Sequence, residues 1–129
     1  MSNRGDRGAA TTQLVLVTPA VLLFLLLVVQ FALAWHAQHI AQTAASHALA
    51  DTRARDGTTA RGADTARRTL RGTGGRVLRA PHIEVTRDAT SATVEIRVGV
   101  MPVIPGLHLA VEGHAAGPVE RFTTPHAGD

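Results

Sequence analysis

One uninterrupted apolar stretch, Leu14–Ala34, dominates the pattern of hydrophobic and polar positions along the chain. It carries no charge over 21 residues; its only polar members are Thr18 and Gln30, and its only helix breaker is Pro19. An α-helix of this length extends about 31 Å at about 1.5 Å per residue, close to the hydrocarbon thickness of a bilayer. Because a core helix in a small domain is apolar on one face only, the pattern predicts a membrane-spanning helix.

The flanks of this stretch indicate its orientation. Arg4 and Arg7 precede it, whereas no arginine follows it until Arg53, and positive charge beside a span favours the cytoplasmic side. Trp35 stands where an aromatic residue anchors a helix at the membrane interface. We therefore expect a single-pass protein of the cell membrane, with its N-terminus in the cytoplasm and the last 95 or so residues outside.

A secretory signal peptide is the competing interpretation of the same stretch. The segment 32–34, Ala-Leu-Ala, offers a small-x-small cleavage site that would leave Trp35 as the first residue. However, the apolar run is longer than the usual signal core of roughly 7–15 residues, and the helical pattern continues through residue 34. We therefore favour a membrane helix that is retained.

Helical spacing continues beyond the apolar stretch, over residues 36–56. Small or apolar residues recur on one side, at Ala37, Ile40, Ala41, Ala44, Ala45 and Ala48. We expect the membrane helix to continue outward as an amphipathic helix, about 40 residues long in all. This alanine-rich seam has two interpretations: it lets the backbone of another subunit approach closely, or it faces the chain's own domain.

The remaining sequence predicts a short second helix followed by strands. Asp56 and Gly57 end the long helix, and Thr58 or Thr59 is the candidate N-cap of a helix that ends within 72–75. Apolar and polar residues then alternate over 83–86, 93–100 and 107–112, with turns at 88–91 and 102–106. A strand start at 77–78, interrupted by Pro81, and a short edge over 119–122 complete the expected set.

These strands predict an antiparallel meander with one apolar face. Pairing Val85 with Val94 would set Glu84 against Glu95, so we favour a register shifted by two residues that sets Glu84 opposite Arg97. The apolar face needs a cover, which the alanine-rich helix or the second helix provides. The predicted fold class is therefore α+β, with a long N-terminal helix packed on a small antiparallel meander.

This organisation divides the chain into five parts. They are a basic leader (1–13), a transmembrane helix (14–35), its helical extension (36–56), a small extracytoplasmic α+β domain (57–122) and a disordered tail (123–129).

Composition and motifs argue against several functional classes. The 13 arginines are spread along the chain and interleaved with acidic residues, and aromatic residues are few, so no nucleic-acid surface is indicated. No cysteine is present, which excludes disulfides and thiol chemistry, and no sequence motif of a known catalytic type occurs, so we expect neither an enzyme nor a cofactor. His36 and His39 share a helical face, but a zinc site needs three or four ligands, so we expect no metal site.

Four features of the sequence together resemble one family. They are a short basic leader ending in Gly8, an apolar helix with Pro19 as its sixth residue, the segment AQTAASHALA (41–50) after Gln38, and the segment MPVIPGLHLAVEGHAAGPVERF (101–122). These features are similar to those of TadE-like proteins, the minor pilins or pseudopilins of tight-adherence (Flp-type) pilus systems, particularly the actinobacterial type. The resemblance extends over most of residues 7–122 and is strongest in the leader and helix. It implies a pilin-like fold.

The resemblance also implies processing. A membrane prepilin peptidase would cut after Gly8 and leave Ala9 as the new N-terminus. The fifth residue after the cut is usually glutamate in such proteins, but here it is Gln13. Because an amide carries no charge, Gln13 loses the attraction to a neighbouring subunit's amino terminus, although its burial costs less. Either cleavage proceeds with a relaxed requirement, or the protein remains an uncleaved anchor.

Three hypotheses follow. The first is a non-enzymatic structural protein of Flp-type pilus assembly, with the membrane, other pilin-like subunits or pilus assembly proteins, and a prepilin peptidase as partners. The second is a membrane-tethered extracytoplasmic domain that binds a partner outside any filament and keeps its N-terminus intact. The third, a metal-dependent activity on the helix that carries His36 and His39, serves as a contrast.

Overall fold

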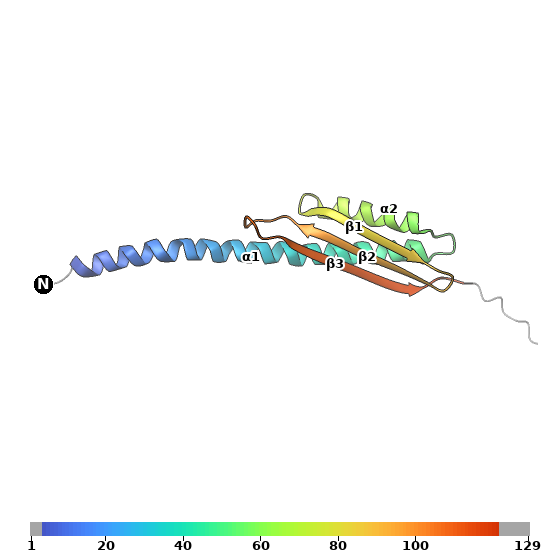
Figure 1. Cartoon of the computed structure of the whole chain (residues 1–129), viewed down its shortest axis with the longest axis horizontal. Coiled ribbons are helices and arrows are strands. Elements are labelled where there is room, and N and C mark those ends of the chain that lie inside the picture. The colour runs from blue at the N-terminus through green and yellow to red at the C-terminus, as the bar shows by residue number, and fades with distance from the viewer. Residues whose placement is uncertain (1–3, 122–129) are drawn as a thin grey trace, which may run out of the picture.

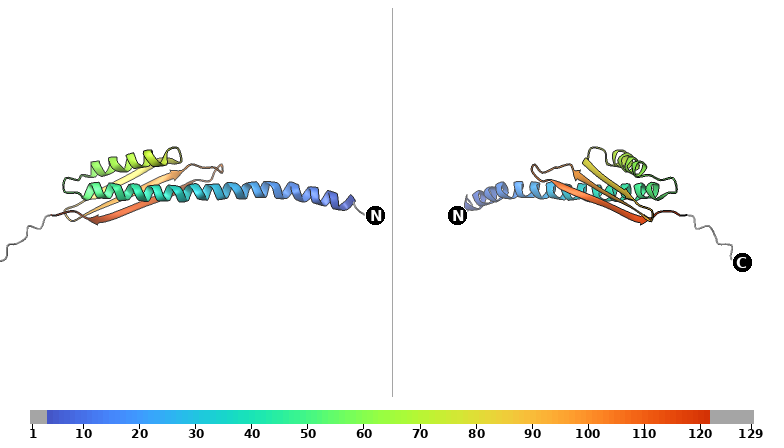
Figure 2. Two further views of the ribbon diagram at one scale, coloured as in Figure 1. Left: turned by 180° about the vertical axis from the view of Figure 1, so that it is seen from behind. Right: turned by 45° about the vertical axis from the view of Figure 1, so that its right-hand side comes forward.

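The computed structural model describes residues 4–121. In chain order the elements are α1 (Arg4–Arg53), α2 (Thr59–Thr69), a π-helical turn η1 (Leu70–Gly74), β1 (Leu78–Arg87), β2 (Ser91–Val100) and β3 (Leu109–Pro118) (Figure 1). The strands form one antiparallel sheet in the order β1-β2-β3. Both helices lie on the same face of the sheet (Figure 2). The predicted α+β architecture, a long N-terminal helix packed on an antiparallel meander, is confirmed.

Helix α1 runs for 50 residues without a break and passes through Pro19. It begins at Arg4, so residues 4–13 of the predicted leader belong to the helix. Once a helix is nucleated, each added residue gains a hydrogen bond at little further cost, so a long helix propagates readily to its end. It ends at Arg53, three residues before the predicted boundary, and the chain turns at Gly57, whose N–H donates to the Ala54 carbonyl at 2.9 Å.

The domain core lies between the second half of α1 and the inward face of β2. Val94, Ile96 and Val98 are almost completely buried there. Against them pack the residues of the seam, all at most 3% exposed: Ala37, Ile40, Ala41, Ala44, Ala45 and Ala48. Of the two interpretations of the seam, this structure therefore shows the second, a helix that faces its own domain.

Glycines permit close approaches to α1 from both β3 and α2. Gly113 of β3 lies directly over the helix backbone, where an added Cβ would contact the Ala41 carbonyl oxygen and stand 2.5 Å from its carbon. Gly62 of α2 lies against the buried Thr52, whose hydroxyl donates to the Ala48 carbonyl at 2.7 Å. Helix α2 begins at the predicted N-cap, since the Thr58 hydroxyl accepts the Arg61 N–H at 3.1 Å.

The β1–β2 register corrects our expectation. Glu84 lies opposite Glu95 and Val85 opposite Val94, so the shifted register is wrong. The turn decides the pairing, because the Asp88 carboxylate accepts the N–H groups of Thr90 and Ser91, both at 2.7 Å. Such an aspartate at the first position fixes a two-residue turn at 89–90, and a local turn outweighs a repulsion between exposed charges.

On the outer face of the sheet, Glu95 and Arg97 of β2 have their ion-pair partners on β3 and not on β1. Glu95 lies 3.6 Å from the His114 ring and Arg97 lies 3.5 Å from Glu112 on β3.

Pro81 does not end β1; a bulge between Arg79 and His82 absorbs it, and Ala80 there has a φ of 45°. The predicted edge over 119–122 is also wrong for residues 119–121, because β3 ends at Pro118. Phe122 and the tail 123–129 lie outside the described residues.

We predict that Gly113→Ala destabilises the fold by about 3 kcal/mol, because the new methyl group would force β3 away from the α1 backbone. Denaturant unfolding of the full chain in detergent micelles, followed by circular dichroism, measures the loss. Gly117→Ala is the matched control on the same face of β3: its nearest contact, 3.2 Å, is the end of the flexible Arg53 side chain. Equal losses for the two variants would contradict the close approach.

A second prediction concerns the turn. Hydrogen bonds from the Thr90 and Ser91 N–H groups, and then from their hydroxyls, lower the pKa of Asp88 well below its ordinary value of 3.8. Because the folded pKa is the lower one, the stabilisation is present above pH 3.8 and is lost as the pH falls through the folded value. Asp88→Ala should lower stability at pH 7 and flatten the acid-induced loss.

Asp88→Asn keeps an acceptor oxygen, so it should lose less stability at pH 7 than Asp88→Ala while showing the same flattened response to acid. Unfolding curves of the three proteins between pH 7 and pH 2 make the comparison. An acid response in Asp88→Asn as steep as in the parent would mean that other groups cause it.

Candidate functional site

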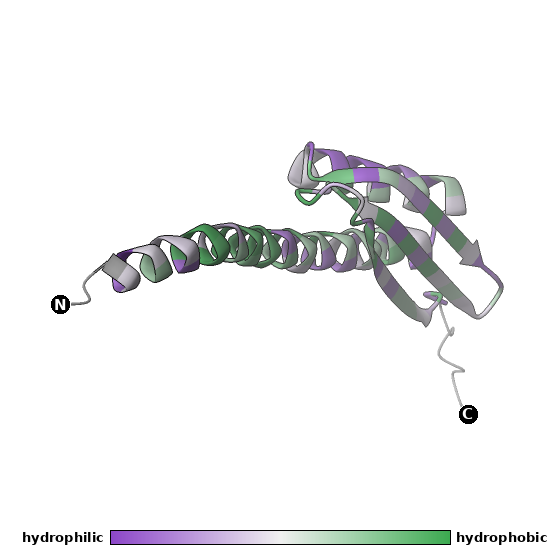
Figure 3. Ribbon diagram, turned by 60° about the vertical axis from the view of Figure 1, so that its left-hand side comes forward, coloured by the Kyte–Doolittle hydropathy of each residue, from purple (hydrophilic) through white to green (hydrophobic). Residues whose placement is uncertain are grey.

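Helix α1 projects beyond the sheet domain, and after the polar turns at its N-terminus the projecting part is apolar all round (Figure 3). Large apolar side chains on every face of this part are exposed, with relative exposures from 40% to 69%: Leu14, Val15, Leu16, Val17, Val21, Leu22, Leu23, Phe24, Leu25, Leu26, Val28, Val29 and Phe31. A surface of this size and shape needs an apolar partner, and the helix is long and apolar enough to cross a membrane. The candidate site is therefore this helix and its junction with the domain.

The predicted processing residues lie on the exposed N-terminal turns of α1. Gly8, Ala9 and Gln13 are all exposed, and nothing lies within 4 Å of the position of a Cβ on Gly8. The hydroxyls of Thr11 and Thr12 bond back to the carbonyls of residues four positions earlier, each at 2.9 Å. Over residues 8–13 the side chains are therefore self-satisfied or small, apart from the amide of Gln13.

Pro19 brings a local defect into the apolar half. Proline has no N–H, so the carbonyl of Val15 loses its helical donor. The preceding residue, Thr18, donates its hydroxyl to the Leu14 carbonyl at 2.8 Å. The helix nevertheless continues through this point, and its neighbours Val15 and Val17 remain exposed. Pro19 makes no contribution to the domain core, in contrast to the other residues predicted to pack.

Gln30 joins the apolar half of α1 to the domain. Although it lies inside the apolar stretch, its side chain is completely buried. Its amide nitrogen donates to the Met101 carbonyl at 3.3 Å, and its oxygen accepts the N–H groups of Val103 at 2.6 Å and Ile104 at 3.4 Å. One side chain thus supplies three hydrogen bonds to the loop between β2 and β3 and holds it against the helix.

From the sequence alone, Gln30 stands out only as a polar member of the apolar stretch. A signal for its role was present, because Gln30 lies seven residues before Ala37 and two heptads before Ala44, which places it in line with the seam. A single uncharged amide on a buried stripe, in an otherwise apolar segment, indicates a hydrogen-bonding partner brought from elsewhere in the chain. The identity of that partner depended on the tertiary fold.

Two more glutamines of α1 cover the open edge of β3. Gln38 donates to the Glu112 carbonyl at 2.6 Å. Gln42 donates to the His114 carbonyl at 2.8 Å and accepts the His114 N–H at 3.2 Å. Side-chain amides therefore occupy backbone groups that would otherwise template another strand, which protects this edge from aggregation.

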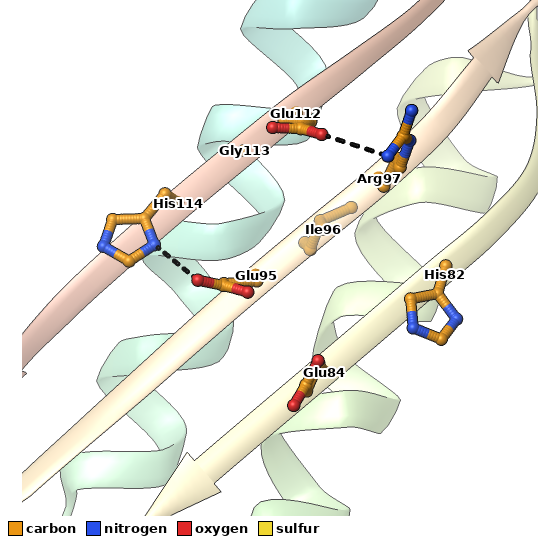
Figure 4. A pocket seen from close by; sticks show the side chains of 8 residues that line it. All are labelled: His82, Glu84, Glu95, Ile96, Arg97, Glu112, Gly113 and His114. Atoms are coloured by element: carbon orange, nitrogen blue, oxygen red, sulfur yellow. Dashed lines mark ion pairs between the residues drawn. The ribbon is translucent and has the colours of Figure 1, made fainter.

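An open groove of about 410 Å³ lies on the outer face of the sheet, away from the helices (Figure 4). His82 and Glu84 come from β1, Glu95 and Arg97 from β2, and Glu112 and His114 from β3. Its ion pairs are exposed by 60% or more and therefore weak. No group of three metal-ligating side chains occurs among residues 4–121; His36 and His39 lie on α1, where His39 meets the Trp35 ring edge to face at 5.5 Å.

We predict that Gln30→Leu frees the β2–β3 loop, because the Val103 N–H loses its acceptor in a buried setting. The loss of stability should be about 1–3 kcal/mol, and the amides of Val103 and Ile104 should exchange hydrogen at least tenfold faster. Hydrogen exchange of the full chain in micelles measures the exchange rates of both backbone amides. Gln38→Leu is the control, since water replaces its single exposed bond; unchanged exchange in Gln30→Leu would contradict the anchoring role.

Comparison with known protein families matches residues 8–49 to the family described as TadE-like protein. This family is associated with Tad/Flp pilus systems. No curated protein and no solved structure shows significant similarity to the chain. The match begins at Gly8, at the predicted processing position, and ends one residue after Ala48, the last residue of the seam. It confirms the predicted resemblance over residues 8–49, which comprise the apolar half of α1 and most of its packed half and are similar to the TadE-like family.

Proposed function

We propose that this chain is a non-enzymatic, membrane-anchored structural protein of Flp-type pilus assembly, similar to a minor pilin or pseudopilin. The observation that carries the proposal is the division of α1 at Gln30: the helix is unburied and apolar before it, and part of a domain core after it. One continuous helix thus serves two surroundings, and the segment that does so is the one that matches the TadE-like family.

The membrane is the partner that the apolar half requires. Thirteen large apolar side chains between Leu14 and Phe31 stand about half exposed. Removing each side chain from water is worth roughly 1–2 kcal/mol of free energy, or on the order of 20 kcal/mol together. This free energy strongly favours burial of the helix in lipid over its exposure to water. The basic leader favours a cytoplasmic N-terminus, so the sheet domain lies outside the cell membrane in this proposal.

Processing by a prepilin peptidase would follow from this placement. Gly8 stands five residues before the apolar stretch, where it is exposed and unhindered. Cleavage there would leave Ala9 as an amino terminus close to Gln13, which can accept a hydrogen bond from a neighbouring subunit's terminus but offers no charge. Lateral contacts between helices would then use the exposed faces of the apolar half, because the seam of the outer half is occupied by the sheet.

The test is the N-terminal residue of the protein purified from its native membrane, read from its intact mass. We expect a start at Ala9. Gly8→Leu should abolish the shortened form, because the bulky side chain stands next to the bond to be cut. Gly5→Leu is the matched control, since Gly5 is an equally exposed and unhindered glycine of the same helix, and it should be processed as the parent is.

Other starting residues would contradict the proposal in distinguishable ways. A start at Met1 or Ser2 would exclude pilin-type processing and favour a simple anchor that presents a binding domain outside any filament. A start at Trp35 would identify a secretory signal and remove the membrane half of the helix. Shortening of Gly8→Leu to the same extent as the parent would show that another site is cut.

A further inference from the structure

We propose that the loop between β2 and β3, Met101–Leu107, is a second membrane contact: it enters the outer interface of the bilayer that α1 spans. This inference rests on the membrane span of the proposed function. Figure 1 shows the loop reaching along α1 toward its N-terminal half, beyond the ends of the other strands. The partner that this loop contacts is the lipid surface itself, for four reasons.

The first reason is length. The apolar residues before the domain begins to cover α1 are Leu14–Leu26, since Leu27 is half-buried and Gln30 is buried under the loop. Thirteen residues of helix extend about 20 Å, whereas the hydrocarbon core of a bilayer is about 30 Å thick. The span therefore needs the residues up to about Ala34, and the loop that is bound to Gln30 lies at the depth of that last part.

The second reason is that α1 exposes large apolar side chains near Gln30, on the faces that the loop does not cover. Val28, Val29 and Phe31 are 50%, 47% and 62% exposed, and Trp35 is 72% exposed. If the bilayer ended at Leu26, all four would stand in water. A boundary near Trp35 covers the first three with lipid and sets the indole at the interface, where tryptophan is enriched.

The third reason is the chemistry of the loop. Residues 98–111 include no Asp, Glu, Lys or Arg, and the loop itself reads MPVIPGL. Met101 is 39% exposed, so part of this apolar side chain faces the surroundings at the tip of the sheet. Exposed arginines flank the loop at positions 76 and 79; Val77 between them accepts the Met101 N–H at 2.8 Å, and Arg79 pairs with Gly99. An apolar tip with arginines behind it suits a membrane interface, because an arginine can lay its aliphatic stem on apolar surface and keep its charge in water.

The fourth reason is the loop's backbone, which is prepared for a surrounding poor in water. Pro102 and Pro105 have no N–H, Val103 and Ile104 donate to Gln30, and Leu107 donates to the Ile104 carbonyl at 3.1 Å. Among the described residues, Gly106 is the one loop position whose N–H finds no partner. Gln30 thus does for this loop what water does for an ordinary exposed turn.

The test places single probes on the full chain in nanodiscs of phosphatidylcholine with phosphatidylglycerol. Because the chain has no cysteine, Met101→Cys, Phe24→Cys and Ala89→Cys each give one labelling site for an environment-sensitive fluorophore. Phe24 reports the membrane span, and Ala89, an exposed residue of the opposite turn, reports water. Lipid-attached nitroxides and aqueous iodide serve as quenchers of the two surroundings.

We expect quenching of the Met101 probe by nitroxides at the headgroup level and at least fivefold less quenching by iodide than for Ala89. A Met101 probe as open to iodide as Ala89, with Phe24 quenched by acyl-chain nitroxides, would overturn this inference and leave the anchor intact. A Met101 probe shielded from iodide but untouched by lipid nitroxides would assign the loop to a protein partner, such as a second copy, and also overturn it. A Phe24 probe in water would refute the membrane span and the inference together.

Discussion

The constraint on which the rest of the structure depends is that α1 is one continuous helix with two different surroundings. From Leu14 to Val29 it is apolar on nearly every face and largely uncovered by the described chain, while its second half is apolar on one stripe and supplies half of a domain core. A continuous helix transmits position and direction from one half to the other, so the sheet domain is held at a fixed distance and angle from whatever surrounds the first half.

Small residues allow the second half of α1 to pack closely against the sheet. Alanines along the buried stripe bring the sheet close to the helix, and at Gly113 the β3 backbone meets the helix backbone without any side chain between them. Such close packing gains dispersion contacts along the whole interface, which a domain of this size without disulfides depends on. The same stripe is then closed to other subunits, which leaves the apolar first half for contacts between chains.

Three glutamines on α1 share a second task, the satisfaction of backbone groups that have no strand partner. Gln38 and Gln42 do this along β3, and Gln30 does it for the β2–β3 loop. An amide both donates and accepts without carrying charge, so it can act at the edge of an apolar region where an ionised side chain would be costly. In this arrangement Gln30 marks the level at which the domain and the proposed bilayer meet.

The sequence by itself determined the elements, because their signals are local: an uncharged apolar run, a 3.6-residue periodicity of alanines, an N-cap threonine, and strict alternation in the strands. It also carried the features of the leader and helix that resemble TadE-like proteins, and that resemblance is confirmed over residues 8–49. The tertiary structure alone decided three matters. These are the β1–β2 register, where the Asp88 turn overrode the charge argument; the occupation of the alanine seam by the chain's own sheet; and the pairing of Gln30 with a loop more than 70 residues away. Periodicity shows which face of an element is to be covered, but the covering partner is chosen by packing and hydrogen bonding in three dimensions.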